Sequence, residues 1–223
     1  MHECLGYLVQ FFFILKNLLT ALCRKKNLPP PDIQRLIQYF NRQAPLSEEE
    51  ENLISELFSP KTYRKRQYLL QEGDVAKYFN FVETGCLRLY KIDEKGVPHI
   101  LQFATEDGWI TDIQSFQKQI PSELSIDAIE DTAVFQISLE KLNTLYERAP
   151  KFNLIFRRLS EKNQQLLQAR ILQMLSGDSR DCYLSFTETY PHLLNRLPQV
   201  QIASFIGITP EFLSKMRGKM ARE

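Results

Sequence analysis

The chain has 223 residues, of which 43% are apolar and 25% are charged, a composition typical of a globular protein with one or two domains. A net charge of +1 argues against a chain that attracts nucleic acid or membranes over its whole surface. The four cysteines, Cys4, Cys23, Cys86 and Cys182, are too far apart for a CxxC metal or redox motif. We expect them to be reduced, buried thiols in a cytoplasmic protein.

Residues 1–31 form an apolar extension that ends in a linker. Residues 5–22 are almost long enough to span a bilayer, which takes about 20 residues, but Lys16 interrupts the run and no cleavage site follows it. Three interpretations stay open: a membrane anchor, a helix docked on the body or on a partner, and an extension created by a misassigned start codon. Membrane contact is not favoured. Pro29, Pro30 and Pro31 then break the chain.

Residues 32–150 are predicted to form an antiparallel β-roll preceded by two helices, at residues 32–40 and 47–58. Ser47 and Glu50 have the spacing of a capping box at the start of the second helix. From residue 62 to about 137 the apolar period changes to two, and turns rich in Gly and Asp separate short runs, which is typical of a barrel or a double-sheet roll. The roll could enclose a ligand pocket or be filled by side chains. The expected strands are 67–71, 78–83, 87–92, 99–104, 124–129 and 133–137.

Residues 151–176 are predicted to form a long dimerisation helix, after a shorter helix at 139–148. No Gly or Pro occurs between residues 152 and 175. Apolar residues at roughly heptad spacing form a stripe on this helix, and the stripe needs an apolar surface to pack against. A second copy of the helix would supply that surface, and a polar residue within the stripe would fix the register of the two helices. The alternative is that the stripe packs only on its own roll. The stripe consists of Phe152, Ile155, Leu159, Leu166 and Ile171, and the polar residue Asn163 interrupts it.

Residues 177–223 are predicted to form a helix-turn-helix domain, with its first helices near 180–187 and 190–194. Counting from Gln199, Ala203 is fifth and small, so a second helix can cross closely above it. Gly207 is ninth and allows a positive φ at the turn. Thr209, Pro210 and Glu211 form a strong helix start, with a cap, a proline at the first helical position and an acid in the first turn. Apolar residues expected to form the shared core are Ile202, Ile206, Ile208, Leu213 and Met216.

A helix-turn-helix places its second helix in the major groove of DNA. Glu can accept a hydrogen bond from cytosine, and Lys can donate one to guanine. Basic side chains around the helix would meet phosphates. The alternative is a three-helix unit that only packs. The expected DNA-binding residues are Glu211, Ser214, Lys215, Arg217, Lys219, Arg222 and Arg196.

The chain resembles the Crp/Fnr family of bacterial transcription regulators from about residue 45 to residue 217, and within it the branch common in Bacteroidetes. The most specific segments are YLLQEGD at 68–74, FVETGCLRL at 81–89, WITD at 109–112, RLPQ at 196–199 and IASFIGITPE at 202–211. The resemblance implies an α+β fold: a cyclic-nucleotide-binding-like double-sheet roll with flanking helices, a long dimer helix and a C-terminal helix-turn-helix. It implies DNA bound as an inverted repeat, a homodimer, and RNA polymerase as a further partner.

The departures from this family concern the effector. Members that bind cyclic AMP hold its ribose with a Gly-Glu pair and its phosphate with an Arg followed by Ser or Thr. The matching positions here are Thr111-Asp112 and Ser122-Glu123, and a glutamate repels a phosphate. These four residues mark the candidate effector pocket, with an effector other than cyclic AMP. The iron–sulfur members need an N-terminal cysteine cluster that this sequence does not have, and His99 is not expected to ligate haem. No cofactor or metal is therefore expected.

The sequence also leaves little room after the second helix of the motif for the β wing that family members usually carry. Two other functions stay open. One is a ligand-binding roll that has lost DNA binding. The other is a cupin-like enzyme, which we disfavour because His2, His99 and His192 are scattered along the chain rather than clustered as metal ligands.

Overall fold

The computed structural model describes residues 28–176 and 179–220. The expectations for residues 1–27, including Cys4, Cys23 and the apolar run, and for Arg222 lie outside the described residues. Helix α2 (Ile33–Gln43) is capped by Asp32, and helix α3 (Glu48–Leu57) by Ser47. Both halves of the predicted capping box between Ser47 and Glu50 are present, so the helix start predicted there is confirmed.

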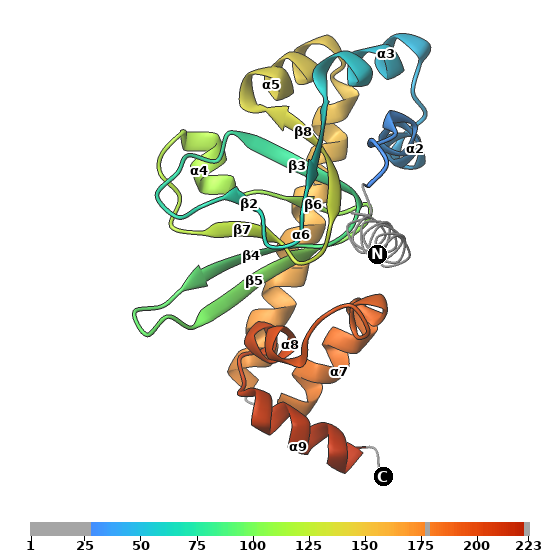
Figure 1. Ribbon diagram of the computed structural model, residues 1–223. Helices are drawn as coiled ribbons and strands as arrows, with labels where there is room; N and C mark the ends of the chain where they lie inside the picture. Colours follow the sequence, from blue (N-terminus) through green and yellow to red (C-terminus); the bar gives the residue numbers. More distant parts are fainter. Residues whose placement is uncertain (1–27, 177–178, 221–223) are drawn as a thin grey trace, which may run out of the picture.

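The centre of the molecule is an antiparallel β-roll of two four-stranded sheets (Figure 1). One sheet has the strand order β1-β8-β3-β6 and the other the order β2-β7-β4-β5. The predicted double-sheet roll is therefore confirmed, and with it the α+β class. The strands are β1 (Ser59–Tyr63), β2 (Tyr68–Leu70), β3 (Tyr78–Thr84), β4 (Leu87–Ile92), β5 (Pro98–Ala104), β6 (Trp109–Ile110), β7 (Ser125–Ala128) and β8 (Thr132–Ser138).

Three elements of the roll were not predicted. Strand β1 contains Pro60, and a proline is tolerated there because β1 lies at the edge of its sheet. Strand β6 has only two residues. It leads into helix α4 (Ile113–Lys118), whose N-terminus is capped by the Asp112 carboxylate through the N–H groups of Gln114 and Ser115. Such short elements carry too little periodicity to be recognised from sequence.

Aromatic rings fill the end of the roll that α2 and α3 cover. Trp109 lies with its ring centroid 5.2 Å from that of Phe81 and 5.9 Å from that of Phe40. Phe40 in turn meets Phe152 edge to face at 5.1 Å. Helices α2 and α3 and the start of the long helix that contains Phe152 therefore share one core with the sheets.

Helix α5 (Leu139–Arg148) leads into the long helix α6 (Lys151–Ser176), which runs along the roll toward the C-terminal helices (Figure 1). The predicted stripe on α6 divides into two parts. Phe152 and Ile155 are buried in the chain's own core, and Leu159 packs against its edge. Leu166 is 43% exposed. The first half of the stripe therefore packs on its own roll, as the alternative interpretation held, because the aromatic core already supplies its apolar partner.

The remaining helices are α7 (Ser179–Thr189), the 3-10 turn at Pro191–Leu193, α8 (Gln199–Ile206) and α9 (Pro210–Met220). They form a second apolar core, which also includes Tyr90, Ile100 and Phe103 of the roll. The C-terminal helices are thus docked on strands β4 and β5 of the same chain. Within the described ranges, no helix is long and apolar enough to cross a membrane.

Candidate nucleic-acid interface and effector pocket

Helices α8 and α9 meet in the geometry that the sequence predicted. Ala203 and Leu213 are fully buried between the helices. Gly207 ends α8 with φ +79°, and the Ile208 N–H donates to the carbonyl of Ala203. The Thr209 hydroxyl accepts a hydrogen bond from the Phe212 N–H at 3.2 Å, and Pro210 is the first residue of α9. The turn and the predicted helix start are therefore confirmed.

The outer face of α9 is polar and exposed. Glu211, Ser214, Lys215 and Lys219 are exposed on it, beside Phe212, which is 50% exposed. Arg217 is half-buried, and its guanidinium carbon lies 5.9 Å from the centre of the Tyr183 ring. Helix α9 therefore exposes the carboxylate of Glu211 and the ammonium groups of Lys215 and Lys219. These groups can form hydrogen bonds with base edges and contact phosphates.

Arg196 lies apart from this face and is engaged within the chain. Its guanidinium donates to both oxygens of Glu106, at 2.8 and 3.0 Å, and also to Glu130. The hydrogen bonds that Arg196 donates to Glu106 are the main reason that the pKa of Arg196 is raised, against an opposing effect of burial. Both carboxylates belong to turns of the roll, so Arg196 links the helix-turn-helix unit to the roll instead of pointing into solvent.

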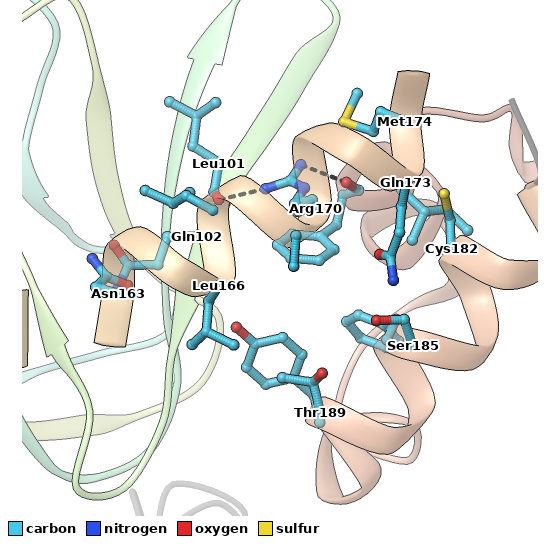
Figure 2. Close-up of a pocket in the computed structure, with 16 residues that line it drawn as sticks. Leu101, Gln102, Asn163, Leu166, Arg170, Gln173, Met174, Cys182, Ser185 and Thr189 are labelled. Atoms are coloured by element: carbon cyan, nitrogen blue, oxygen red, sulfur yellow. Dashed lines mark hydrogen bonds between the residues drawn. The ribbon is translucent and has the colours of Figure 1, made fainter. Parts of the chain in front are cut away.

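Arg170 of α6 makes a second link that sequence reasoning did not find (Figure 2). Its two terminal nitrogens donate to the carbonyls of Ile100 at 2.8 Å and Leu101 at 2.6 Å. One of them also donates to the carbonyl of Phe205 at 2.5 Å, which is among the last carbonyls of α8 and is left unpaired by the helix. The guanidinium also lies 3.8 Å from the centre of the Phe205 ring. One cation therefore joins the long helix, the roll and the helix-turn-helix unit, and burial lowers its pKa.

Acid should weaken the contact of Glu106 with Arg196. Burial alone would raise the pKa of Glu106, but hydrogen bonds from Arg196 and from the Gly85 N–H outweigh it, and the net pKa is lowered from 4.5. A carboxyl group whose pKa is lower in the folded state than in the unfolded state stabilises the fold at any pH above its unfolded-state pKa. This stabilisation is lost as the pH falls through its folded-state pKa. We therefore expect the melting temperature to fall below about pH 4.5 more steeply in the wild type than in Glu106→Gln. Thermal denaturation followed between pH 7 and 3 measures this, and identical slopes would contradict it.

The four predicted effector-pocket residues do not form one pocket. Thr111 donates to the Tyr78 carbonyl at 2.9 Å and lines a cavity of about 520 Å³ with Tyr63, Asn80 and Gln136. Asp112 and Ser122 are brought together, since the Ser122 hydroxyl donates to the Asp112 carboxylate at 2.7 Å. Asp112 caps helix α4, and Ser122 belongs to the chain turn beside this cap.

Glu123, the fourth residue, is exposed on the surface. It accepts a hydrogen bond from Lys91 at 2.7 Å, and 81% of its side chain is accessible. Hydrogen bonding from Lys91 is the main reason that the pKa of Glu123 is lowered, so the group is held as an anion. A carboxylate paired with Lys91 therefore stands at the position where the resemblance leads us to expect a hydroxyl residue.

The cysteine and histidine side chains of the described residues show no metal or nucleophile site. Cys86 and Cys182 are buried and form no disulfide, so their predicted burial is confirmed. Burial raises the pKa of the Cys86 thiol to about 12. His99 contacts Asp93 at 2.9 Å on the surface. Within the residues described, no three His, Cys, Asp or Glu side chains gather where they could hold a metal ion.

Comparisons with known proteins agree with this architecture. The cyclic nucleotide-binding domain family matches residues 60–149. FixK2 from Bradyrhizobium japonicum superposes with a TM-score of 0.63 at 18% identity, covering 74% of this chain and 85% of its own. The global regulator CLP from Xanthomonas campestris gives 0.63 at 14% identity, over 79% of this chain and 92% of its own. A Crp/Fnr family protein from Eubacterium rectale gives 0.62 at 17% identity, over 80% and 85%.

No curated protein matches the sequence, and nothing in these comparisons bears on the Bacteroidetes branch. At these identities the neighbours establish the fold. Residues 60–149 match the cyclic nucleotide-binding domain family, and the chain has the fold of solved transcription regulators of the Crp/Fnr type.

Proposed function

We propose that the protein is a homodimeric transcription regulator that binds a specific DNA sequence through α9. The observation that carries this proposal is the exposed polar face of a helix that is held, by the αL turn at Gly207 and the cap at Thr209, in helix-turn-helix geometry. We assign residues 32–150 to the sensor roll, 151–176 to the dimer helix and 177–223 to the DNA-binding domain. The neighbours with this fold include transcription regulators, which supports the regulator role. A cytoplasmic location and RNA polymerase as a further partner are part of the proposal.

The residues of α9 divide into two roles. Glu211, Ser214 and Lys215 lie near its N-terminal end, which in this motif contacts base edges. Arg217 and Lys219, with Arg222 beyond the described residues, are suited to phosphates. Arg196 joins this set only if its bonds to Glu106 and Glu130 open. DNA binding would then compete with the contact between the helix-turn-helix unit and the roll.

Lys219→Ala should weaken DNA binding without changing the sequence that is bound. Each phosphate contact contributes about 0.9 to the slope of log K against log salt, so losing one contact per subunit should reduce the slope by about 2 in a dimer. Fluorescence anisotropy with a labelled duplex at several salt concentrations measures the slope. The matched control is Lys61→Ala, an exposed lysine on strand β1. Equal effects of the two substitutions would contradict the assigned role of Lys219.

The second half of α6 supports the homodimer. Between Leu166 and Leu175 it exposes six large apolar side chains, which form an unusually large apolar surface to leave in contact with water. Leu172 is 67% exposed and Leu175 is 78% exposed. A second copy packed along this surface would bury it, so the dimer seam is proposed here and not at Phe152 and Ile155. The six residues are Leu166, Leu167, Ile171, Leu172, Met174 and Leu175.

Leu172→Glu should convert the dimer into monomers, because it places a carboxylate in each half of an apolar seam. We expect the dimer dissociation constant to rise at least 100-fold, since an unpaired buried charge costs about 3 kcal/mol or more. Sedimentation velocity across a concentration series gives the constant. Asn143→Glu, which adds the same charge at an exposed position of helix α5, is the control. A wild-type chain that is monomeric at all concentrations would refute the proposed seam.

The effector is proposed to be something other than cyclic AMP. Ser122 stands where the resemblance expects the phosphate-binding arginine, Glu123 is an anion paired with Lys91, and Asp112 is used as a helix cap. The cavity of about 520 Å³ beside Thr111 favours a second candidate function, a ligand-binding roll without DNA binding. A ligand that binds tightly to a protein with no salt-dependent DNA affinity would support this candidate over the first.

A further inference from the structure

Phe212 is the one phenylalanine that is exposed in the part of the chain that the structure describes. It is 50% exposed, whereas the other phenylalanines in residues 28–176 and 179–220 are buried or half-buried. Single exposed apolar residues are common on protein surfaces and need no function. The place of this ring in the helix-turn-helix unit is what distinguishes it from such residues.

Phe212 lies on the outer face of α9, beside the residues that are proposed to contact bases. It is the third residue of α9 (Pro210–Met220), one residue after Glu211 and three residues before Lys215, and residues three or four apart share one face of a helix. Leu213, the next residue, is fully buried against the rest of the unit. Helix α9 lies at the end of the molecule, away from the roll (Figure 1), so the roll does not cover the ring.

The backbone on both sides of this ring is fixed. The Phe212 N–H donates to the Thr209 hydroxyl at 3.2 Å, and the Leu213 N–H donates to the Thr209 carbonyl at 3.0 Å. The buried side chain of Leu213 anchors the same turn of the helix. The ring of Phe212 therefore starts from a defined point on the face of α9, which reduces the entropy lost when it makes a contact.

The major groove offers such a ring a particular partner. Base pairs present hydrogen-bond donors and acceptors in this groove, and thymine adds a C5-methyl group, which phenylalanine can contact. The pairings available to Glu211 and Lys215, with cytosine and guanine, use hydrogen bonds. An apolar ring between these polar groups is instead complementary to a methyl group.

From these features we propose that Phe212 is a specificity-determining residue that contacts the methyl group of one thymine in each half-site. The proposal rests on the proposed DNA-binding function and extends it to a base that the polar residues of α9 do not read. The thymine lies close to the base pairs that Glu211 and Lys215 contact, because the three residues share the N-terminal end of α9.

Replacing thymidine by deoxyuridine tests this contact, because the replacement removes only the methyl group and keeps the hydrogen-bonding groups of the base. The probe is a duplex that the wild-type protein selects from a random pool, with each thymidine of a half-site and its symmetry mate replaced in turn. Fluorescence anisotropy gives the dissociation constants. At one position we expect wild-type binding to weaken about 4-fold per half-site, as for the loss of one buried methyl group, and about 15-fold for the pair.

Substitutions at Phe212 assign this effect to the ring. Phe212→Ala should bind the thymidine and deoxyuridine duplexes with dissociation constants that agree within about twofold, whereas Phe212→Leu, which keeps a large apolar side chain, should retain part of the preference. The matched control is Val200→Ala. It removes a side chain that is 57% exposed from α8, the helix that crosses the DNA backbone in this motif, and it should keep the wild-type preference.

The proposal is overturned if no thymidine position shows this effect. It is also overturned if Phe212→Ala prefers thymidine over deoxyuridine as strongly as the wild type does, even where the substitution weakens binding to both duplexes. Either result would leave the proposed DNA binding intact. Selection of no common sequence by the wild-type protein would instead refute DNA reading by α9, and the thymine contact with it.

Discussion

Arg170→Ala should release the helix-turn-helix unit from the roll. The substitution removes the donors of three carbonyls, those of Ile100, Leu101 and Phe205, and the cation that lies 3.8 Å from the Phe205 ring centre. Hydrogen bonds to a charged group contribute about 1.5–3 kcal/mol each before the cost of burying the cation is subtracted. We expect a net loss of about 2–4 kcal/mol from the free energy of docking. Hydrogen exchange should then be accelerated at least 30-fold in the amides that β5 and α8 protect.

The matched control is Arg157→Ala, which removes an arginine from the same helix. Arg157 is largely exposed, and its partner Glu161 is one turn away at 3.5 Å, a kind of pair that contributes less than about 1 kcal/mol. Exchange in β5 and α8 should be unchanged in this variant. If Arg170→Ala also leaves exchange there unchanged, Arg170 does not join the two units.

Phe40→Ala should lower the stability of the whole roll. Phe40 is fully buried and meets the rings of Phe152, Trp109 and Phe58 at 5.1 to 6.0 Å. Removing a buried phenylalanine costs about 3–5 kcal/mol through lost transfer energy and the cavity left behind. Chemical denaturation followed by the fluorescence of Trp109, the single tryptophan of the chain, reports the loss where it occurs.

Phe212→Ala is the control for this change, because Phe212 is half exposed on α9 and its removal should alter stability by less than about 0.5 kcal/mol. A loss in Phe40→Ala no larger than in this control would contradict the view that α2 and the start of α6 belong to the core of the roll.

Local signals in the sequence predicted the local structure well. The capping box at Ser47 and the start of α9 at Thr209 depend on contacts within four residues, so their spacing is visible in the sequence. The αL turn at Gly207 is visible for the same reason. The alternation of apolar residues predicted the strands of the roll, although not the order in which they pair, because pairing depends on residues distant in the sequence.

The links between the two units could not be predicted in the same way. Arg170 and Arg196 have partners 35 to 90 residues away, and a single arginine gives no sequence signal for such a partner. Resemblance suggested phosphate contact for Arg196, whereas in the structure Glu106 and Glu130 occupy it. Resemblance to the family identified four positions in the sequence as effector residues. In the structure, however, Asp112 caps a helix and Glu123 is exposed.

The central claim is that two copies of α9 read a specific DNA sequence, and selection from a pool of random duplexes by the purified protein tests it most directly. We expect the selected duplexes to share an inverted repeat with half-sites about 10 base pairs apart, centre to centre, as a two-fold dimer requires. Lys215→Ala and Glu211→Ala should each relax the preference at particular positions of both half-sites. Selection of no common sequence, at low salt and with the wild-type dimer, would contradict the claim and leave the protein as a ligand-binding roll.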